Sequence, residues 1–398
     1  MSTMHDGLRY TLRGSAAIEK RMAAMMSRVA GSIAKHFRPH EYRSVVLLGG
    51  YGRGEGGVIR DMTGEHLHNN IDLLLVTATW GRKSGLKKRI DTVLAPIAAN
   101  EKIGIDTGVI GEMELRHAPP HVIWFDVRWG HRTILGDAAI VPSLRPLAAK
   151  DIAVDDVHAL LVNRASLLVI NDAIFERGEP APHHARYVVK HLMKAIIGHG
   201  DALLFTHGRY HAGYLEKQRR MRDIATLTPG LAELYDAAAE FRFSPDYERY
   251  ARENLRDFTQ RTRDTLAAAH LAFERLRSDR RDCTFANHIE RVLENKPSST
   301  TFTARMKRMA NARASGLLRQ TILHRKEAHG HCPRAVLAAV LPTVLYGSNT
   351  DQARLTQSLL RASDCSPQAL RHAYLRYWAE HGDPNFRHTA EQLGIHLE

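Results

Sequence analysis

Six glycines stand within nine residues near the start of the chain, in the segment Leu47-Leu-Gly-Gly-Tyr-Gly-Arg-Gly-Glu-Gly-Gly57. Glycine lets the backbone approach a ligand closely, and successive backbone N–H groups in such a turn form a concave surface that binds anions. Arg53 adds a guanidinium group, whose planar fork of donors fits a phosphate. The segment therefore predicts a phosphate-binding turn that includes Gly49, Gly50 and Arg53.

An acidic residue follows on a second apolar run, Asn69-Asn-Ile-Asp-Leu-Leu-Leu-Val76, which reads as a buried strand. Asp72 lies near the start of this strand. Asn70 is two residues earlier, so it points to the same face. A carboxylate beside a phosphate-binding turn calls for a hard divalent cation, because Mg²⁺ takes oxygen ligands and commonly bridges carboxylates to substrate phosphates. We therefore expect a site for Mg²⁺, or Mn²⁺, at Asn70 and Asp72.

The apolar spacing predicts which elements carry these residues. Hydrophobic residues make up 44% of the chain and charged residues 25%, which is typical of a folded globular protein. The predicted strands are Arg43–Leu48, Ile71–Val76, Lys102–Ile110 and Val122–Arg128, with helices at 14–37 and 83–99 and a linker at Gly136–Leu147. The later helix candidates are 155–176, 186–206, 246–278, 301–327, 334–345, 351–362 and 366–380. The expected class is α+β, a small mixed sheet followed by a large all-α region.

The glycine turn and the acidic strand resemble the DNA polymerase β nucleotidyltransferase superfamily. In that superfamily, a Gly-Gly or Gly-Ser turn after the first strand precedes an Asp-x-Asp pair on the second strand and a third Asp on the next. The wording Gly-Gly-Tyr-Gly-Arg-Gly-Glu is most similar to bacterial uridylyltransferases that modify nitrogen-signalling proteins. The helical part resembles the accessory domain of small bacterial nucleotidyltransferases, including those that adenylylate aminoglycosides. The resemblance is good over residues 40–140, loose over 155–220 and absent beyond.

The resemblance implies a role for each matching residue. Gly49 and Gly50 would hold the triphosphate, and Asp72 would match the second Asp of the pair, a metal ligand. The third carboxylate, which helps to deprotonate the acceptor hydroxyl, has two candidates. Asp106 lies on the strand expected third and follows the superfamily order, and Asp126 lies on the strand expected fourth.

Asn70 departs from the superfamily pattern, because an amide replaces the first Asp. Its carbonyl oxygen can still ligate a cation, but one negative charge is lost, and two adjacent metal ions rely on carboxylates for neutralisation. We therefore expect the site to hold the nucleotide-borne metal ion alone, unless Glu55 or Glu65 compensates.

Two lysines of the helical part, Lys190 and Lys194, are one helical turn apart and so share a face. In small nucleotidyltransferases of similar layout, a lysine from the helical domain reaches the triphosphate. This interpretation and that of a solvated helix face both remain open.

The formal net charge of +13 favours polyanionic partners, namely nucleoside triphosphates, nucleic acid or an acidic membrane surface. Residues 301–330 hold seven Arg or Lys residues against one Glu, which fits either an RNA- or partner-binding surface or a solvated helix. These basic residues are Arg305, Lys307, Arg308, Arg313, Arg319, Arg325 and Lys326.

The remaining signals bear on metals and on location. His329-Gly-His331-Cys332 has zinc-ligand types but no second pair, so we interpret it as a loop. Three cysteines do not suggest a disulfide scaffold, and the first ten residues contain no apolar signal core. The longest apolar stretch, Ala335–Tyr346, is too short to span a bilayer. We therefore expect a cytoplasmic protein with no membrane partner.

Taken with the resemblance, the sequence predicts four parts. They are an N-terminal helix at 1–40, a nucleotidyltransferase-like domain at 41–148, a helical domain completing the cleft at 151–282, and a helical region of unknown role at 283–398. The expected function is metal-dependent transfer of a nucleoside monophosphate, from ATP or another triphosphate, to a hydroxyl of a small molecule, a protein or an RNA. The alternative is a degenerate relative that binds nucleotide, RNA or protein.

Overall fold

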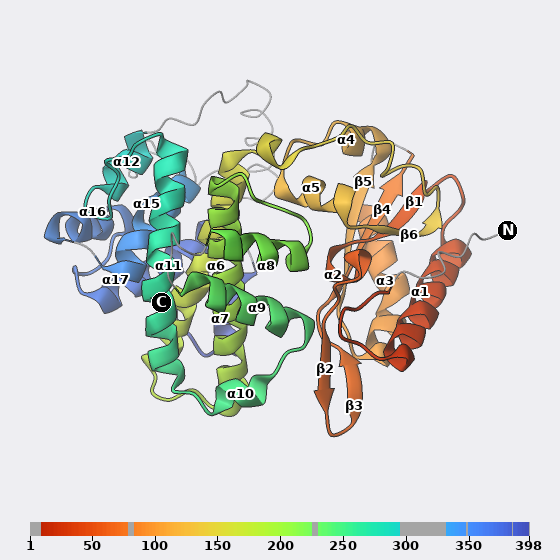
Figure 1. The fold of residues 1–398 in the computed structure, drawn as a ribbon, viewed down its shortest axis with the longest axis horizontal. Helices are drawn as coiled ribbons and strands as arrows, with labels where there is room; N and C mark the ends of the chain where they lie inside the picture. The colour runs from red at the N-terminus through yellow and green to blue at the C-terminus, as the bar shows by residue number, and fades with distance from the viewer. Residues whose placement is uncertain are drawn as a thin grey trace. The chain divides into compact units, whose positions relative to one another are not determined.

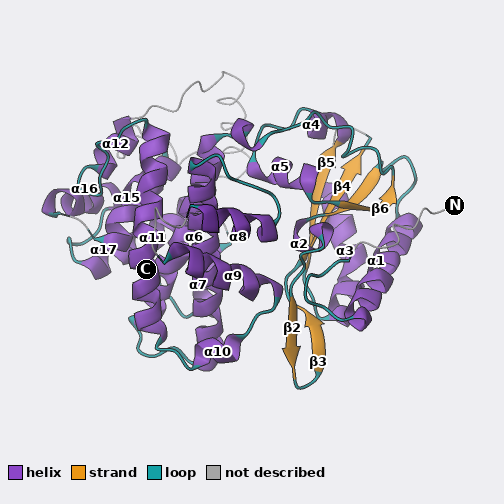
Figure 2. Ribbon diagram, in the orientation of Figure 1, coloured by secondary structure: helices purple, strands orange, loops and turns teal. Residues whose placement is uncertain are grey.

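A computed structural model of the chain describes residues 9–78, 83–224, 230–294, 332–347, 349–383 and 385–397. An N-terminal mixed four-stranded sheet is followed by a largely helical region (Figures 1 and 2), which confirms the α+β class. The chain divides into two compact units. The first comprises Met1–Val157 and His207–Arg249, and the second comprises His158–Thr206 and Tyr250–Glu398.

The sheet of the first unit has the strand order β5-β4-β1-β6. Its strands are β1 Ser44–Leu47, β4 Ile71–Thr77, β5 Ile105–Gly111 and β6 Arg132–Gly136. Strand β1 is antiparallel to both of its neighbours, whereas β4 and β5 are parallel and are joined through α3, Lys83–Glu101. Because β4 and β5 run in the same direction, the acidic residues near their starts lie at one edge of the sheet.

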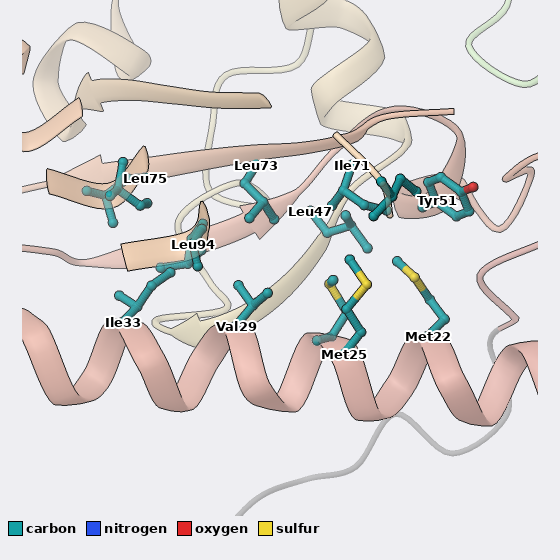
Figure 3. Close-up of a cluster of buried hydrophobic side chains, with 14 of the residues drawn as sticks. Met22, Met25, Val29, Ile33, Leu47, Tyr51, Ile71, Leu73, Leu75 and Leu94 are labelled. Carbon is teal, nitrogen blue, oxygen red and sulfur yellow. The ribbon is translucent and has the colours of Figure 1, made fainter. Parts of the chain in front are cut away.

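One face of the sheet packs against α1, Ala16–His36, and α3. The apolar residues of α1 recur every three or four positions, so they form one stripe that faces the strands. Figure 3 shows the resulting buried cluster, which includes Met22, Met25, Val29, Ile33, Leu47, Ile71, Leu73, Leu75 and Leu94. On the other face, Val46 and Leu74 pack with Leu115 and Val127. Burial of both faces explains the unbroken apolar runs of β1 and β4.

The prediction of a fourth strand at Val122–Arg128 is wrong, because these residues belong to helix α5, Val122–Trp129. Val122 and Phe125, one helical turn apart, are both buried, and the backbone N–H of Val122 donates to Asp156 Oδ2 at 2.8 Å. Periodicity cannot distinguish strand from helix in so short an apolar run. The linker was predicted at Gly136–Leu147. Gly136 is the last residue of β6, and residues 137–147, all of them described, contain no helix or strand.

Several elements of the first unit have no counterpart in the prediction. The segment after the glycine turn, predicted as a polar loop, is a hairpin of β2, Val58–Asp61, and β3, Gly64–Leu67. Strand β6 was also not predicted, and neither were the short helices α2 Gly49–Arg53, α4 Glu112–Arg116, α8 Tyr214–Asp223 and α9 Leu231–Phe243, whereas α10, Tyr247–Ala251, lies within the helix predicted at 246–278. Helices α8 and α9 belong to the same compact unit as the sheet. The units therefore divide after Val157, Thr206 and Arg249, whereas the sequence predicted domain boundaries at 148 and 282.

Helices are the only regular secondary structure in the described residues of the second unit. Its helices include α6 Val154–Phe175, α7 Pro182–Thr206, α11 Leu255–Ser278, α12 His288–Glu294, α15 Pro333–Tyr346, α16 Thr350–Leu360, α17 Pro367–His381 and α18 Phe386–Gln392. The helix predicted at 246–278 is interrupted before Asn254, whose side chain caps α11. The helix expected at 301–327, the basic residues of that segment, His329 and His331 lie outside the described residues.

Helix α6 is the one described helix that is long and apolar enough to cross a membrane. However, 67% of its most apolar stretch is buried inside the protein. The core helix of a soluble protein can be equally long and apolar, so α6 is weak evidence either for or against a place in a membrane.

Candidate functional site

The glycine turn is held against Asp72. The backbone N–H of Leu48 donates to the carbonyl of Asp72 at 2.8 Å, and the chain then bends into α2 at Gly49, whose φ is +65°. A Cβ atom on Gly49 would lie 2.6 Å from Asp72 Oδ2. The position therefore requires glycine twice over, for its left-handed backbone and for the closeness of the carboxylate. The turn and the acidic side chain lie on the same side of β1 and β4.

Asp106 is the partner of Asp72 in the register of the parallel strands β4 and β5. Loss of surrounding water raises the pKa of Asp72, and the nearby Asp106 carboxylate raises it further, while Arg242 and Arg53 lower it. Two neighbouring carboxylates repel each other when both are ionised, and a divalent cation relieves that repulsion. The Asp72–Asp106 pair therefore has the oxygen donors and the charge that suit Mg²⁺ or Mn²⁺.

Asn70 lies beside the same pair and is used as a hydrogen-bond donor. Its Nδ2 donates to Asp106 Oδ2 at 2.9 Å, and a Cβ atom on Gly104 would lie 2.8 Å from its Oδ1. The amide oxygen thus faces Gly104, and the amide would have to rotate before it could ligate a cation shared with Asp106. The role of Asn70 as a metal ligand stays a prediction.

Arg53 is fixed in place by packing and by charge. Its side chain is only 9% exposed, and its stem lies on Gly130, where a Cβ atom would meet Cγ of Arg53 at 2.0 Å. Its Nε donates to Glu55 Oε2 at 3.3 Å. Burial disfavours the charged guanidinium, but Asp126, Tyr214 and Glu55 outweigh that effect, so the pKa of Arg53 is raised. Arg53 is therefore a fully charged, pre-positioned cation beside Asp72.

Asp126, the alternative third carboxylate, lies on helix α5 and not on a strand. It accepts a hydrogen bond from the hydroxyl of Tyr210 at 3.3 Å, and its charge acts on Arg53. Asp106 is the carboxylate that the structure pairs with Asp72. From these contacts we infer that Asp126 stabilises the positive charge of Arg53.

Sequence reasoning missed three residues from the later part of the chain, Arg242, Tyr214 and Lys217. The Arg242 guanidinium lies 4.5 Å from the centre of the Tyr214 ring, and the Arg53 guanidinium lies 5.5 Å from it. The ammonium of Lys217, a residue only 1% exposed, lies 4.6 Å from the same ring. Nε of Arg242 is buried with no hydrogen-bond partner among the described residues. Three cations thus surround one tyrosine ring near Asp72.

Glu55 explains how α8 is anchored to the glycine turn. Its Oε2 accepts from the backbone N–H of Tyr214 at 3.0 Å and its Oε1 from that of Leu215 at 3.3 Å, so the carboxylate caps the N-terminus of α8. Glu65 instead accepts from the backbone N–H of Ser15 at 3.0 Å and pairs with Arg60. Neither glutamate therefore replaces the charge that is missing at Asn70.

Lys190 and Lys194 lie on α7 in the second unit, the first half-buried and the second exposed. They flank the buried His191, whose pKa is lowered to about 3 by burial and then by the two lysine charges. The predicted contact of these lysines with a triphosphate stays a prediction.

No group of three or more His, Cys, Asp or Glu residues in the described part of the chain is arranged to hold a metal ion. A cation at the Asp72–Asp106 pair would therefore need further oxygen ligands from a substrate, as is usual for Mg²⁺. Comparisons with family models, with curated proteins and with solved structures give no match for this chain.

Proposed function

We propose that this chain is a metal-dependent nucleotidyltransferase, which moves a nucleoside monophosphate from a triphosphate to an acceptor hydroxyl. The observation that carries the proposal is the contact between the Gly49 turn and the Asp72 carboxylate, with Asp106 beside it on the next strand. A phosphate-binding turn and a pair of oxygen ligands at one sheet edge suit a metal–triphosphate complex.

The residues around the turn supply the positive charge that a triphosphate needs. Arg53 offers a planar donor fork, and Arg242 adds a second guanidinium whose charge acts on Asp72 and lowers its pKa. Lys217 adds a point charge behind the Tyr214 ring. Fixed cations of this kind stabilise charge that develops on phosphate oxygens without reorganising during the reaction.

In the reaction, an acceptor oxygen attacks the α-phosphorus, and the bond from that phosphorus to the oxygen bridging the α- and β-phosphates breaks. Asp106 receives the hydroxyl proton, and pyrophosphate leaves with the bonding electron pair. Asp72 and Asp106 would hold Mg²⁺ or Mn²⁺, which neutralises phosphate charge when bound. The remaining catalysis is positioning by Gly49, Gly50 and Arg53.

The proposal is tested by a transfer assay. Purified protein receives each α-labelled triphosphate, ATP first, with Mg²⁺ or Mn²⁺ and a lysate containing small molecules, proteins and RNA. We expect label to appear on one class of acceptor, and Asp72→Asn to reduce transfer by about a hundredfold, because a charge acting on the transition state is lost. Asp61→Asn, which removes an exposed carboxylate of strand β2, should leave transfer unchanged.

A second candidate function is a binding protein without transfer activity, which engages nucleotide, RNA or a protein. It is favoured by the hydrogen bond from Asn70 to Asp106, because that bond engages one of the two carboxylates. In this case, Mg–ATP binds to the wild-type protein while no label moves to any acceptor.

A further inference from the structure

One exposed tryptophan lies next to the residues of the proposed phosphate site. Trp129 is the last residue of α5 and is 66% exposed, a large value for the largest apolar side chain. The aliphatic part of the Arg53 side chain packs against the neighbouring residue, Gly130. A Cβ atom on Gly52 would lie 3.1 Å from the carbonyl oxygen of Gly130. Consecutive Cα atoms are about 3.8 Å apart, so the Cα atom of Trp129 lies about that distance from that of Gly130, the residue that contacts the phosphate-binding turn.

The direction of Trp129 follows from its place on the helix. It is three residues after Asp126 and four after Phe125, so the three side chains share one side of α5. Asp126 accepts from the Tyr210 hydroxyl at 3.3 Å, and the Phe125 ring lies 5.7 Å from the Tyr210 ring. The Trp129 ring lies 6.3 Å from the Phe125 ring, which is buried and holds that side of the helix in place.

We propose that Trp129 is the platform on which the base of the bound nucleotide stacks. The inference rests on the proposed function, because it needs a triphosphate at the Gly49 turn. Every nucleobase has a π face, so an indole binds any of them, and the larger purines overlap with it more than pyrimidines do. We therefore expect ATP and GTP to bind similarly and both to bind more tightly than CTP or UTP.

The test compares a nucleotide with the same phosphates lacking a base. Binding of ATP and of inorganic tripolyphosphate, each with Mg²⁺, is measured by calorimetry for the full chain. Trp129→Ala should weaken ATP binding about tenfold, the usual effect of losing one stacked base, and should leave tripolyphosphate binding unchanged. Trp129→Phe should retain most of the ATP affinity while losing the fluorescence quenching that ATP causes in the wild type.

Ile123→Ala is the matched control. Ile123 is also apolar and exposed on α5, but it lies six residues from Trp129, about 9 Å along the helix axis. Its removal should change neither affinity. The inference is overturned if Trp129→Ala binds ATP as the wild type does, or if it loses tripolyphosphate equally. Wild-type protein that binds neither ligand would overturn the proposed function as well, whereas binding of tripolyphosphate without a preference for ATP would overturn the stacking alone.

Discussion

Asn70 determines the charge of the candidate metal site. Replacing it with Asp restores the missing carboxylate beside Asp72 and Asp106 and turns the hydrogen bond to Asp106 into a repulsion. We expect Asn70→Asp to lower the stability of the metal-free protein, because three carboxylates then lie together. We also expect Mg²⁺ affinity in the presence of ATP to rise at least about tenfold, since one more charge attracts the cation. The transfer rate should rise with it.

Metal titration by calorimetry and the labelled-transfer assay measure these effects. Asn69→Asp is the control, because it adds the same charge one residue away, at a side chain that lies against Gly57 and has no hydrogen bond to Asp106. If Asn70→Asp lowers both the metal affinity and the transfer rate, position 70 does not contribute to the metal site as proposed.

The turn between β1 and α2 can be tested as an element by comparing two glycines with the same backbone angle. Gly49 and Gly208 both have φ of +65°, but a Cβ atom would meet Asp72 Oδ2 only at Gly49, and at Gly208 it meets nothing within 4 Å. Each Ala substitution should cost about 1 kcal/mol of unfolding free energy through the left-handed backbone. We expect Gly49→Ala alone to displace Asp72 and to weaken Mg–ATP binding at least about tenfold. Equal nucleotide affinities in the two variants would contradict this role of the turn.

The elements that sequence patterns predicted well are an amphipathic helix with one apolar stripe and strands with nearly unbroken apolar runs. Helix α1 and strands β1, β4 and β5 agree with the prediction because α1 buries its apolar stripe in one core and the strands bury apolar residues in the cores on both faces of the sheet. Helix α5 was predicted as a strand, because Val, Ile, Trp and Phe favour strands and its eight residues are too few to show a helical period. Helix α8 was missed because its sequence is charged, and its contacts include the Glu55 cap and pairs of Glu216 with Arg219 and Arg220.

At the scale of the whole molecule, the sequence was sufficient to predict where the candidate site lies, but not to predict all of the residues that surround it. Gly49 and Asp72 are close in sequence and lie on elements joined by one hairpin, so local pattern was sufficient to pair them. Arg242 and Lys217 return to the same unit after the chain has passed through α6 and α7. No local pattern predicts such a return, because it depends on which long-range contacts α8 and α9 make.

The second unit predicts a pH dependence of stability that is independent of the candidate site. Burial lowers the pKa of His199 to about 4 and, with the charges of Lys194 and Lys190, that of His191 to about 3, from an ordinary value of 6.5. Burial likewise holds the pKa of His270 well below 6.5. The buried Glu274 stays ionised, because His158 and His288 outweigh its desolvation and hold its pKa well below 4.5.

All four shifts have the same sign, because the folded state binds fewer protons than the unfolded state. The stability contributed by the histidines is complete above pH 6.5 and is lost as the pH falls towards their folded values, and that of Glu274 is lost below about pH 4.5. His199 and His191 should therefore each cost about 2 kcal/mol of unfolding free energy between pH 7 and pH 5, measured by urea titration. His199→Gln should reduce the loss of unfolding free energy between pH 7 and pH 5 by the amount that one histidine contributes. His388→Gln, at an exposed position, should leave that loss unchanged. A free energy of unfolding that is flat between pH 7 and pH 5 would mean that these histidines are not buried in solution as the fold requires.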